Sequence, residues 1–107
     1  YVGCVWCRRM TPHLIPVYND LKSKGLEIVS ISVDPKEDEE KWREAMKEDG
    51  APWLQAWDYE KKLPAEYGVL AYPTMFLLDP EGKVVEKIIG YREGPALREM
   101  FAKYNLK

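Results

Sequence analysis

The sequence predicts an α/β domain, on two observations. Segments with the composition of strands alternate along the chain with segments of helical periodicity, which is the pattern of α/β proteins. The chain has 107 residues, of which 46% are hydrophobic, so it has the size of one ordinary domain and enough apolar side chains for a core. Because no linker, repeat or low-complexity tract interrupts the chain, we expect a single domain over residues 1–107.

A long helix is expected over residues 4–24, because apolar side chains recur along one side of this segment. Gly25 follows it, as a glycine usually follows the end of a helix. Pro12 and Pro16 lie inside the segment, and a proline removes one hydrogen bond of a helix. We therefore expect a kink or a later start.

The other elements follow from composition and from turn residues. A run of β-branched and apolar residues bounded by glycine and Asp-Pro predicts a buried parallel strand. The next helix has an acidic start, and we expect Trp42, Ala45 and Met46 to face inward from it. The expected elements are this strand at 26–33, this helix at 38–49, a short edge strand at 53–57, a short helix at 60–67, a strand at 74–78, a turn at 79–82, a strand at 83–89 and a helix at 95–104.

A further strand is expected to lead into Cys4, because a parallel sheet in this order of elements needs one. Only Tyr1, Val2 and Gly3 are present to supply it, and the first residue is not Met. We therefore expect a central mixed sheet flanked by helices whose first core strand is truncated in this chain. Either upstream residues are missing, or the sheet is completed in another way.

Charge and hydropathy narrow the class of partner. The formal net charge is −2, which gives no reason to expect nucleic acid or an anionic membrane surface as a partner. No apolar run has the length that spans a bilayer, and no signal peptide is visible. The oligomeric state stays open.

The two cysteines, Cys4 and Cys7, lie three positions apart at the start of the first predicted helix. A helix N-terminus presents free N–H groups and positive partial charge, and such sites lower a cysteine pKa from ~8.5 to roughly 3.5–7.5. A disulfide this short closes almost no loop, so it stabilises the fold little. We expect a redox-active pair in which the exposed Cys4 attacks a substrate disulfide and the more buried Cys7 resolves the mixed disulfide.

Other readings of the cysteine pair are a static disulfide, two packed thiols or a zinc site. Structural zinc takes four ligands, and beyond the two cysteines the chain offers only His13. We expect no metal site, and no cofactor other than the redox-active disulfide. His13 lies six residues after Cys7 and is expected at the surface rather than in a catalytic role.

A second signal is Tyr72-Pro73-Thr74, directly before a predicted strand. A proline in this place is a candidate for a cis peptide bond, and it would leave neighbouring backbone groups free to bind an extended substrate peptide. An ordinary trans proline at a strand start is the alternative. Trp53 is expected either in the core or along the groove near this site.

These motifs resemble those of the thioredoxin-like superfamily. Residues 4–14 (CVWCRRMTPHL) resemble the WCxxC[RK]xxxPxL signature, and residues 68–79 (GVLAYPTMFLLD) followed by Gly82-Lys83-Val84 resemble the GVxxxPTxFLIDxxGxI block. Residues 26–34 are similar to the second core strand of these proteins. The resemblance covers essentially the whole chain. It is closest to TlpA/ResA-type (AhpC/TSA-related) thiol–disulfide oxidoreductases, with features of the tryparedoxin/nucleoredoxin group.

The resemblance implies a thioredoxin fold and an enzyme that exchanges disulfides with protein substrates. It implies that Cys4 is the nucleophile, Cys7 the resolving cysteine and Pro73 the cis-proline. Tyr72 would flank the substrate together with Thr74, and Pro12 would kink the helix near the site.

Two positions of the motif differ from the family pattern. Gly3 stands where the family usually has tryptophan before the first cysteine, and Trp6 is expected to replace part of that stacking surface. Where ResA-like members often carry a glutamate, this chain has Met10. No carboxylate that moves protons to Cys7 can be assigned from the sequence.

The function expected from these observations is thiol–disulfide exchange in the reducing direction, with protein thiols or disulfides as substrates and an upstream electron donor. The resemblance points to the periplasm or cell envelope, and a cytoplasmic location is the alternative. A non-catalytic peptide-binding module with this fold, a thiol peroxidase and metal delivery through the two thiolates are the other functions considered. A peroxidase would need threonine or serine three residues before its reactive cysteine, where this chain has Tyr1 or Cys4.

Overall fold

The computed structural model of the chain describes all 107 residues, and its longest helix, α1 (Val5–Leu21), begins one residue after Cys4. It continues into a short 3-10 turn, η1 (Lys22–Lys24). Both prolines of this segment lie inside α1, so the later start that we considered does not occur. Gly25 ends the segment with φ 105°, in the left-handed region that glycine adopts without a steric penalty.

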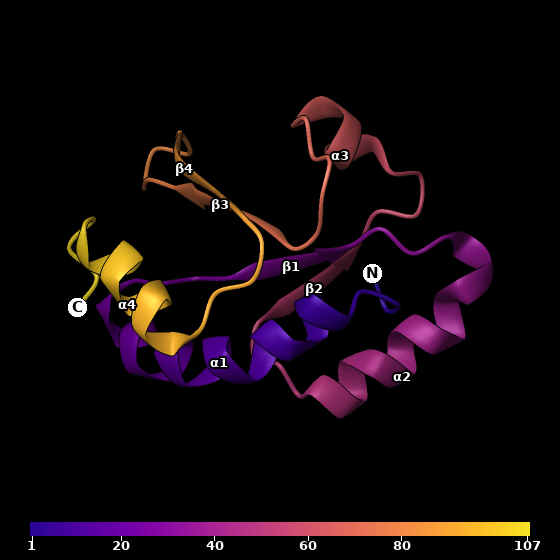
Figure 1. Cartoon of the computed structure of the whole chain (residues 1–107), viewed down its shortest axis with the longest axis horizontal. Helices are drawn as coiled ribbons and strands as arrows, with labels where there is room; N and C mark the ends of the chain where they lie inside the picture. The colour runs from indigo at the N-terminus through magenta and orange to yellow at the C-terminus, as the bar shows by residue number, and fades with distance from the viewer.

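The first pair of strands is parallel. β1 (Val29–Ser32) pairs with β2 (Leu54–Trp57), with Val29 opposite Leu54 and Ser32 opposite Trp57. This pairing confirms the predicted parallel strand and the short strand at 53–57. In Figure 1, β1 and β2 run above α1.

The second pair of strands is an antiparallel hairpin. β3 (Thr74–Leu78) pairs with β4 (Val84–Ile89), with Thr74 opposite Ile89 and an irregularity at Leu77/Leu78. The predicted turn between them is confirmed, because the Gly82 N–H donates to the Asp79 carbonyl at 2.9 Å. The hairpin lies apart from β1 and β2 in Figure 1.

The strands therefore form two two-stranded sheets and not one continuous mixed sheet. β1 was expected to be buried, but Val29 and Ile31 are 53% and 47% exposed. The reason is that β1 has a strand partner along one edge only, while residues 1–3 form a turn closed by the Cys4 N–H on the Tyr1 carbonyl (3.0 Å). One face and one edge of β1 thus remain open to solvent.

The remaining helices lie close to their predicted ranges. They are η2 (Lys36–Asp38) with α2 (Glu39–Asp49), the short α3 (Lys62–Glu66) and α4 (Gly94–Ala102). Along α2 the side chains of Trp42 and Ala45 are buried and Met46 is half-buried, which confirms the inward face predicted for it.

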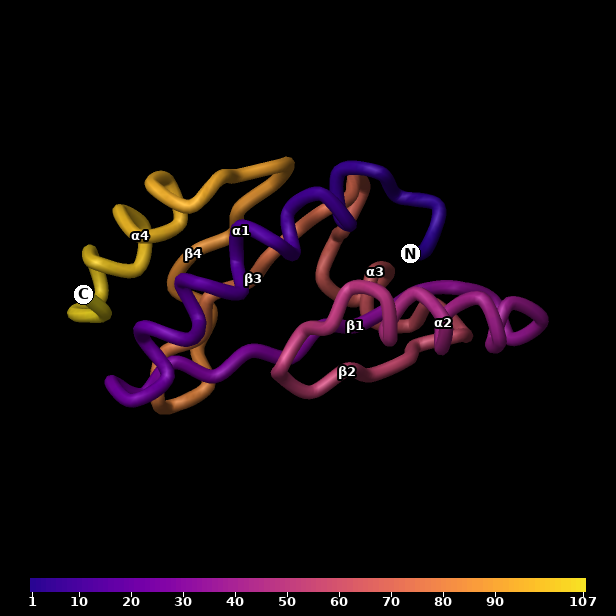
Figure 2. The backbone as a smooth tube through the Cα atoms, turned by 90° about the horizontal axis from the view of Figure 1, so that it is seen from below, coloured from indigo at the N-terminus to yellow at the C-terminus, as the bar shows by residue number.

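The core lies where α1 and α4 pack side by side, as both views of the backbone show (Figures 1 and 2). Its most buried members are Val17 of α1 and Leu97 of α4, each 1% exposed. Trp53 also belongs to this core, where its indole N–H donates to the Ser30 hydroxyl at 2.7 Å. Of its two predicted positions, Trp53 therefore takes the one in the core. The single domain over residues 1–107 stays a prediction.

Candidate active site

Cys4 and Cys7 form a disulfide at the N-terminus of α1, with their Cα atoms 5.3 Å apart. Cys4 is the N-cap residue and has an extended backbone conformation. Its Sγ accepts a hydrogen bond from the Cys7 N–H at 3.2 Å, and its carbonyl accepts the Arg8 N–H. A sulfur atom therefore occupies the position in which a helix N-terminus stabilises negative charge.

The exposure of the two cysteines is the reverse of the expectation. Cys4 is 6% exposed and thus buried, whereas Cys7 is only half-buried. The physical reason is the N-cap conformation, which folds the Cys4 side chain back onto the first turn of α1. In the disulfide form, Cys7 is accordingly the more accessible of the two residues.

The segment around Pro73 leads directly into β3. The Tyr72–Pro73 peptide bond is cis, and Pro73 is buried while Tyr72 is exposed. The Pro73 carbonyl accepts the Gly90 N–H at 2.8 Å, and the Thr74 hydroxyl donates to the Ala71 carbonyl at 2.6 Å. The N–H and the carbonyl of Tyr72 are hydrogen-bonded to no group of the protein.

Aromatic rings lie in two pairs on the segments that carry the site. The rings of Tyr1 and Tyr72 meet edge to face with centroids 5.6 Å apart. The rings of Trp6 and Tyr91 lie 5.2 Å apart, and Tyr91 also meets the ring of His13 at 5.8 Å. Sequence reasoning missed Tyr1 and Tyr91, because neither belongs to a motif and only the fold brings them to the site.

Two of these tyrosines stay neutral to higher pH than usual. Partial burial, followed by the nearby charge of Asp58, raises the pKa of Tyr72. Desolvation raises the pKa of Tyr91, and Glu93, which accepts a hydrogen bond from the Tyr91 hydroxyl, adds to this shift. At neutral pH both side chains are therefore uncharged aromatic groups with a polar tip.

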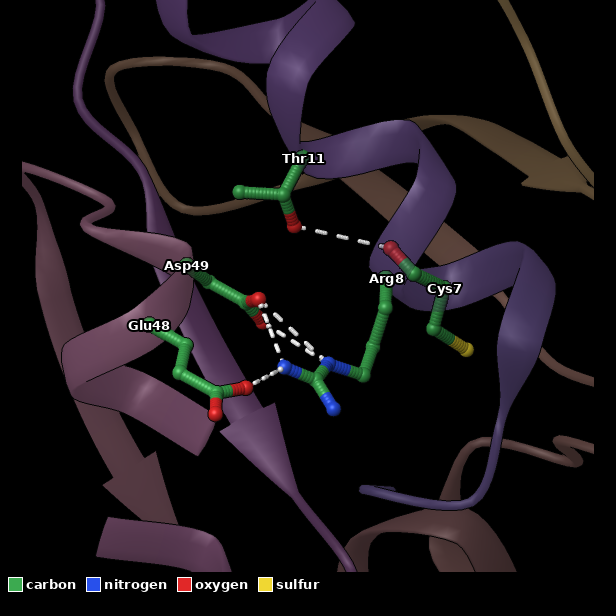
Figure 3. Close-up of polar contacts among 5 residues, drawn as sticks. All are labelled: Cys7, Arg8, Thr11, Glu48 and Asp49. Atoms are coloured by element: carbon green, nitrogen blue, oxygen red, sulfur yellow. Dashed lines mark hydrogen bonds and ion pairs between the residues drawn. The ribbon is translucent and has the colours of Figure 1, made fainter. Parts of the chain in front are cut away.

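Arg8 connects the active-site helix to α2 (Figure 3). Its guanidinium donates to the Asp49 carboxylate through Nε and Nη2, and to Glu48 at 2.8 Å. The hydrogen bonds to these two carboxylates raise the Arg8 pKa, so the charge is fixed at any relevant pH. Figure 3 shows the Cys7 sulfur pointing away from this guanidinium, and the Thr11 hydroxyl near the Cys7 carbonyl at 3.5 Å. The ion pair therefore fixes the position of the first turn of α1.

A buried carboxylate, that of Asp34, holds the segment before Cys4. Asp34 is 4% exposed, and both of its oxygens accept the Val2 N–H at 3.1 Å. The Ser32 hydroxyl donates to it as well. The sequence alone did not single out Asp34. It lies in a cleft of about 490 Å³ beside Tyr1, Gly3 and Tyr72.

The remaining predicted features can be placed briefly. Pro12 lies inside α1, five residues after Cys7. Met10, which stands where ResA-like members often carry a glutamate, is an apolar residue that is 6% exposed. No three His, Cys, Asp or Glu side chains are arranged to hold a metal ion. None of the helices has the length and apolar character needed to cross a membrane.

The arrangement has a close match among solved structures. The thioredoxin domain of a thiol-disulfide oxidoreductase from Bacteroides vulgatus superposes with a TM-score of 0.82 at 33% sequence identity, over 99% of this chain and 74% of that one. Together, the fold and the Cys4–Cys7 disulfide define a thioredoxin-like α/β protein with a CxxC pair at a helix N-terminus. The thioredoxin fold expected from the sequence is thereby confirmed.

The chain belongs to the AhpC/TSA family, whose model matches residues 2–87. It is 36% identical over 87 residues to the thiol-disulfide oxidoreductase ResA of Bacillus thuringiensis (strain Al Hakam). The aligned region covers 81% of this chain and 49% of that protein. It is also 33% identical over 89 residues to nucleoredoxin of Mus musculus, which covers 78% of this chain and 20% of that protein. The chain thus spans about half the length of the ResA proteins that it matches.

Proposed function

We propose that this chain is a protein thiol–disulfide oxidoreductase that works in the reducing direction through Cys4 and Cys7. The observation that carries the proposal is the disulfide at the N-terminus of α1, with the Cys7 N–H on the Cys4 Sγ. After reduction, that N–H and the helix dipole stabilise a thiolate at Cys4. The thiolate is the species that attacks disulfides.

The proposed reaction transfers two electrons in two exchange steps. The Cys4 thiolate attacks one sulfur of a substrate disulfide, so that bond breaks, a mixed disulfide forms and the other substrate sulfur leaves as a thiolate that takes a proton from water. The Cys7 thiol then loses its proton to solvent and attacks the Cys4 Sγ. This step restores the disulfide between Cys4 and Cys7 and releases the second substrate thiol. An upstream dithiol donor reduces the pair again.

Substrate binding is proposed along the segment before β3. The free N–H and carbonyl of Tyr72, whose ring meets that of Tyr1 three residues before Cys4, give an extended peptide two backbone partners, in the manner of strand addition. Pro73 and Thr74 hold this segment through their hydrogen bonds to Gly90 and Ala71. Trp6 is 52% exposed between the two cysteines and gives the substrate an aromatic contact.

The partners that we propose are protein thiols or disulfides and an electron donor, with the disulfide itself as the only redox group. The resemblance to ResA-type proteins supports a periplasmic or envelope location, and a cytoplasmic one is the alternative. Nothing in the site favours the thiol peroxidase or the binding module over disulfide exchange.

Turnover of a protein disulfide tests the proposal. We expect the chain to accelerate the reduction of insulin by dithiothreitol, followed as turbidity, and Cys4→Ser to return the rate to that of dithiothreitol alone. The physical reason is that serine supplies no thiolate at the N-cap. If wild type shows no acceleration while it still binds insulin, the binding-module reading replaces the proposal.

A further inference from the structure

Four aromatic side chains, here called the aromatic frame, lie in two pairs on the segments that carry the active site: Tyr1, Trp6, Tyr72 and Tyr91. In each pair, one residue comes from the N-terminal segment and the other from a distant part of the chain. Tyr1 precedes Cys4 by three residues and Trp6 lies between the cysteines, while Tyr72 precedes Pro73 and Tyr91 follows β4. They meet as two pairs, 5.6 Å and 5.2 Å between centroids. The frame therefore exists only in the folded chain.

Gly3 lets Tyr1 take its place in the frame. A Cβ atom added at Gly3 would lie 3.2 Å from Cε2 of the Tyr1 ring, closer than ordinary van der Waals contact. The absence of a side chain at this position thus makes room for Tyr1 to pack against the turn and reach Tyr72. Tyr1 is nevertheless 49% exposed, so it presents aromatic surface to solvent beside the cleft that it lines with Tyr72.

Three cations next to the frame have no carboxylate partner. The Arg9 guanidinium lies over the Trp6 ring at 5.0 Å and has no carboxylate partner. Arg92 donates to the Tyr91 carbonyl and also has no carboxylate partner. Lys61, in the cleft with Tyr1 and Tyr72, makes no ion pair either.

The acidic groups in the same region already have partners. Asp34 accepts from the Val2 N–H and the Ser32 hydroxyl, and Asp38 pairs with Lys41. Glu93 accepts from the Tyr91 hydroxyl, and Asp58, whose charge acts on Tyr72, accepts from the N–H groups of Lys62 and Leu63. On a chain of net charge −2, the region around the disulfide therefore offers aromatic surface together with free cations.

We propose that the aromatic frame selects extended polypeptide segments whose cysteine is flanked by aromatic and acidic residues. This proposal rests on the proposed function and names the substrate class for the same site. Aromatic side chains of the substrate pack against the two ring pairs, and acidic side chains meet Arg9, Arg92 or Lys61. Tyr1 and Tyr91 are specificity-determining residues.

The experiment measures kcat/KM of the reduced chain on three synthetic peptides, each a disulfide-linked homodimer with one cysteine per strand. One peptide carries Phe and Glu beside the cysteine, the second Phe and Lys, and the third Gly and Ser. Hydroxyethyl disulfide, which is too small to span the frame, serves as the reference substrate. The expected order is the Phe/Glu peptide first, then Phe/Lys, then Gly/Ser.

Variants then assign the preference to named residues. Tyr1→Ala and Tyr91→Ala are each expected to reduce the Phe/Glu over Gly/Ser ratio by about 3- to 10-fold, the value of one aromatic contact. Arg9→Gln is expected to reduce the Phe/Glu over Phe/Lys ratio and to change the Phe/Lys over Gly/Ser ratio little. Tyr67→Ala, at a half-exposed tyrosine that packs on Phe76 outside the frame, is the matched control and leaves all ratios unchanged.

The two proposals fail in different ways. If the wild-type chain reduces hydroxyethyl disulfide but reacts equally fast with the three peptides, the aromatic-frame proposal is overturned and the proposed function stands. Equal losses in Tyr67→Ala and in the frame variants also overturn it. If neither the peptides nor hydroxyethyl disulfide is reduced, the proposed function fails, and the frame proposal fails with it.

Discussion

Cys7→Ser is expected to trap substrate proteins on Cys4 as stable mixed disulfides, while catalytic turnover is lost. The variant keeps the attacking thiolate but lacks the thiol that would resolve the first exchange product. Mass spectrometry of the variant after mixing with a disulfide-containing protein should show a covalent adduct. The adduct should disappear on addition of dithiothreitol.

The exposure of the two cysteines makes this test sharper. Cys7 is the more exposed residue in the disulfide form, which by accessibility alone would favour attack through Cys7. The attack on substrate, however, is made by the reduced chain, in which the stability of the thiolate decides. Only the Cys4 sulfur accepts a backbone N–H at the helix N-terminus, and a hydrogen bond to the charged form favours that form. We therefore expect no adduct with Cys4→Ser, and an adduct through Cys7 in that variant would contradict the order of steps.

Leu97→Ala is expected to lower the free energy of unfolding by about 3–4 kcal/mol, because Leu97 is 1% exposed between α4 and α1. A change of this size is a large part of the 5–15 kcal/mol that typically stabilises a domain. The cost combines lost burial with a cavity that the neighbouring side chains fill only in part. Thermal unfolding followed by circular dichroism should show a Tm lower by roughly 10–20 °C.

Leu70→Ala is the matched control for this prediction. Leu70 is 97% exposed, so the same truncation removes almost no buried surface and should change the free energy of unfolding by less than about 0.5 kcal/mol. Equal effects of the two substitutions would contradict the assignment of the core to the packing of α1 against α4.

Local signals predicted most of the elements. The acidic start and the glycine end of α2, the turn residues of the hairpin and the apolar stripe of α1 each act within a few residues, so the sequence alone located them closely. The CxxC spacing at a helix start likewise predicted the disulfide. Features that depend only on a few neighbouring residues could therefore be predicted from the sequence.

Features that depend on contacts between residues far apart in the sequence could not be predicted. The ion pair of Arg8 with Asp49 joins residues 41 positions apart, and the hydrogen bond of Val2 to Asp34 joins residues 32 apart. Neither pairing leaves a periodic signal in one sequence. The same reason explains why Tyr91, in a loop without a motif, was missed. The exposure of β1 also depends on strand pairing that its own residues do not encode.

The prediction of the relative burial of the two cysteines was wrong for a related reason. A helix start predicts that the first cysteine is exposed, but it does not predict which way the side chain of the N-cap residue turns. Cys4 folds back onto the Cys7 N–H and becomes buried. This conformation brings a sulfur to the site of greatest positive potential on the helix, which is what the proposed chemistry requires.

A redox titration of the Cys4–Cys7 pair in glutathione and dithiothreitol buffers, read by thiol alkylation and mass, tests the central claim most directly. The account predicts a reversible two-electron transition in which both thiols appear together, with a midpoint nearer to that of thioredoxin at about −270 mV than to that of DsbA at about −120 mV. A midpoint at the oxidising end would contradict the reducing direction. A pair that stays oxidised or reduced across the whole range would contradict the redox function itself.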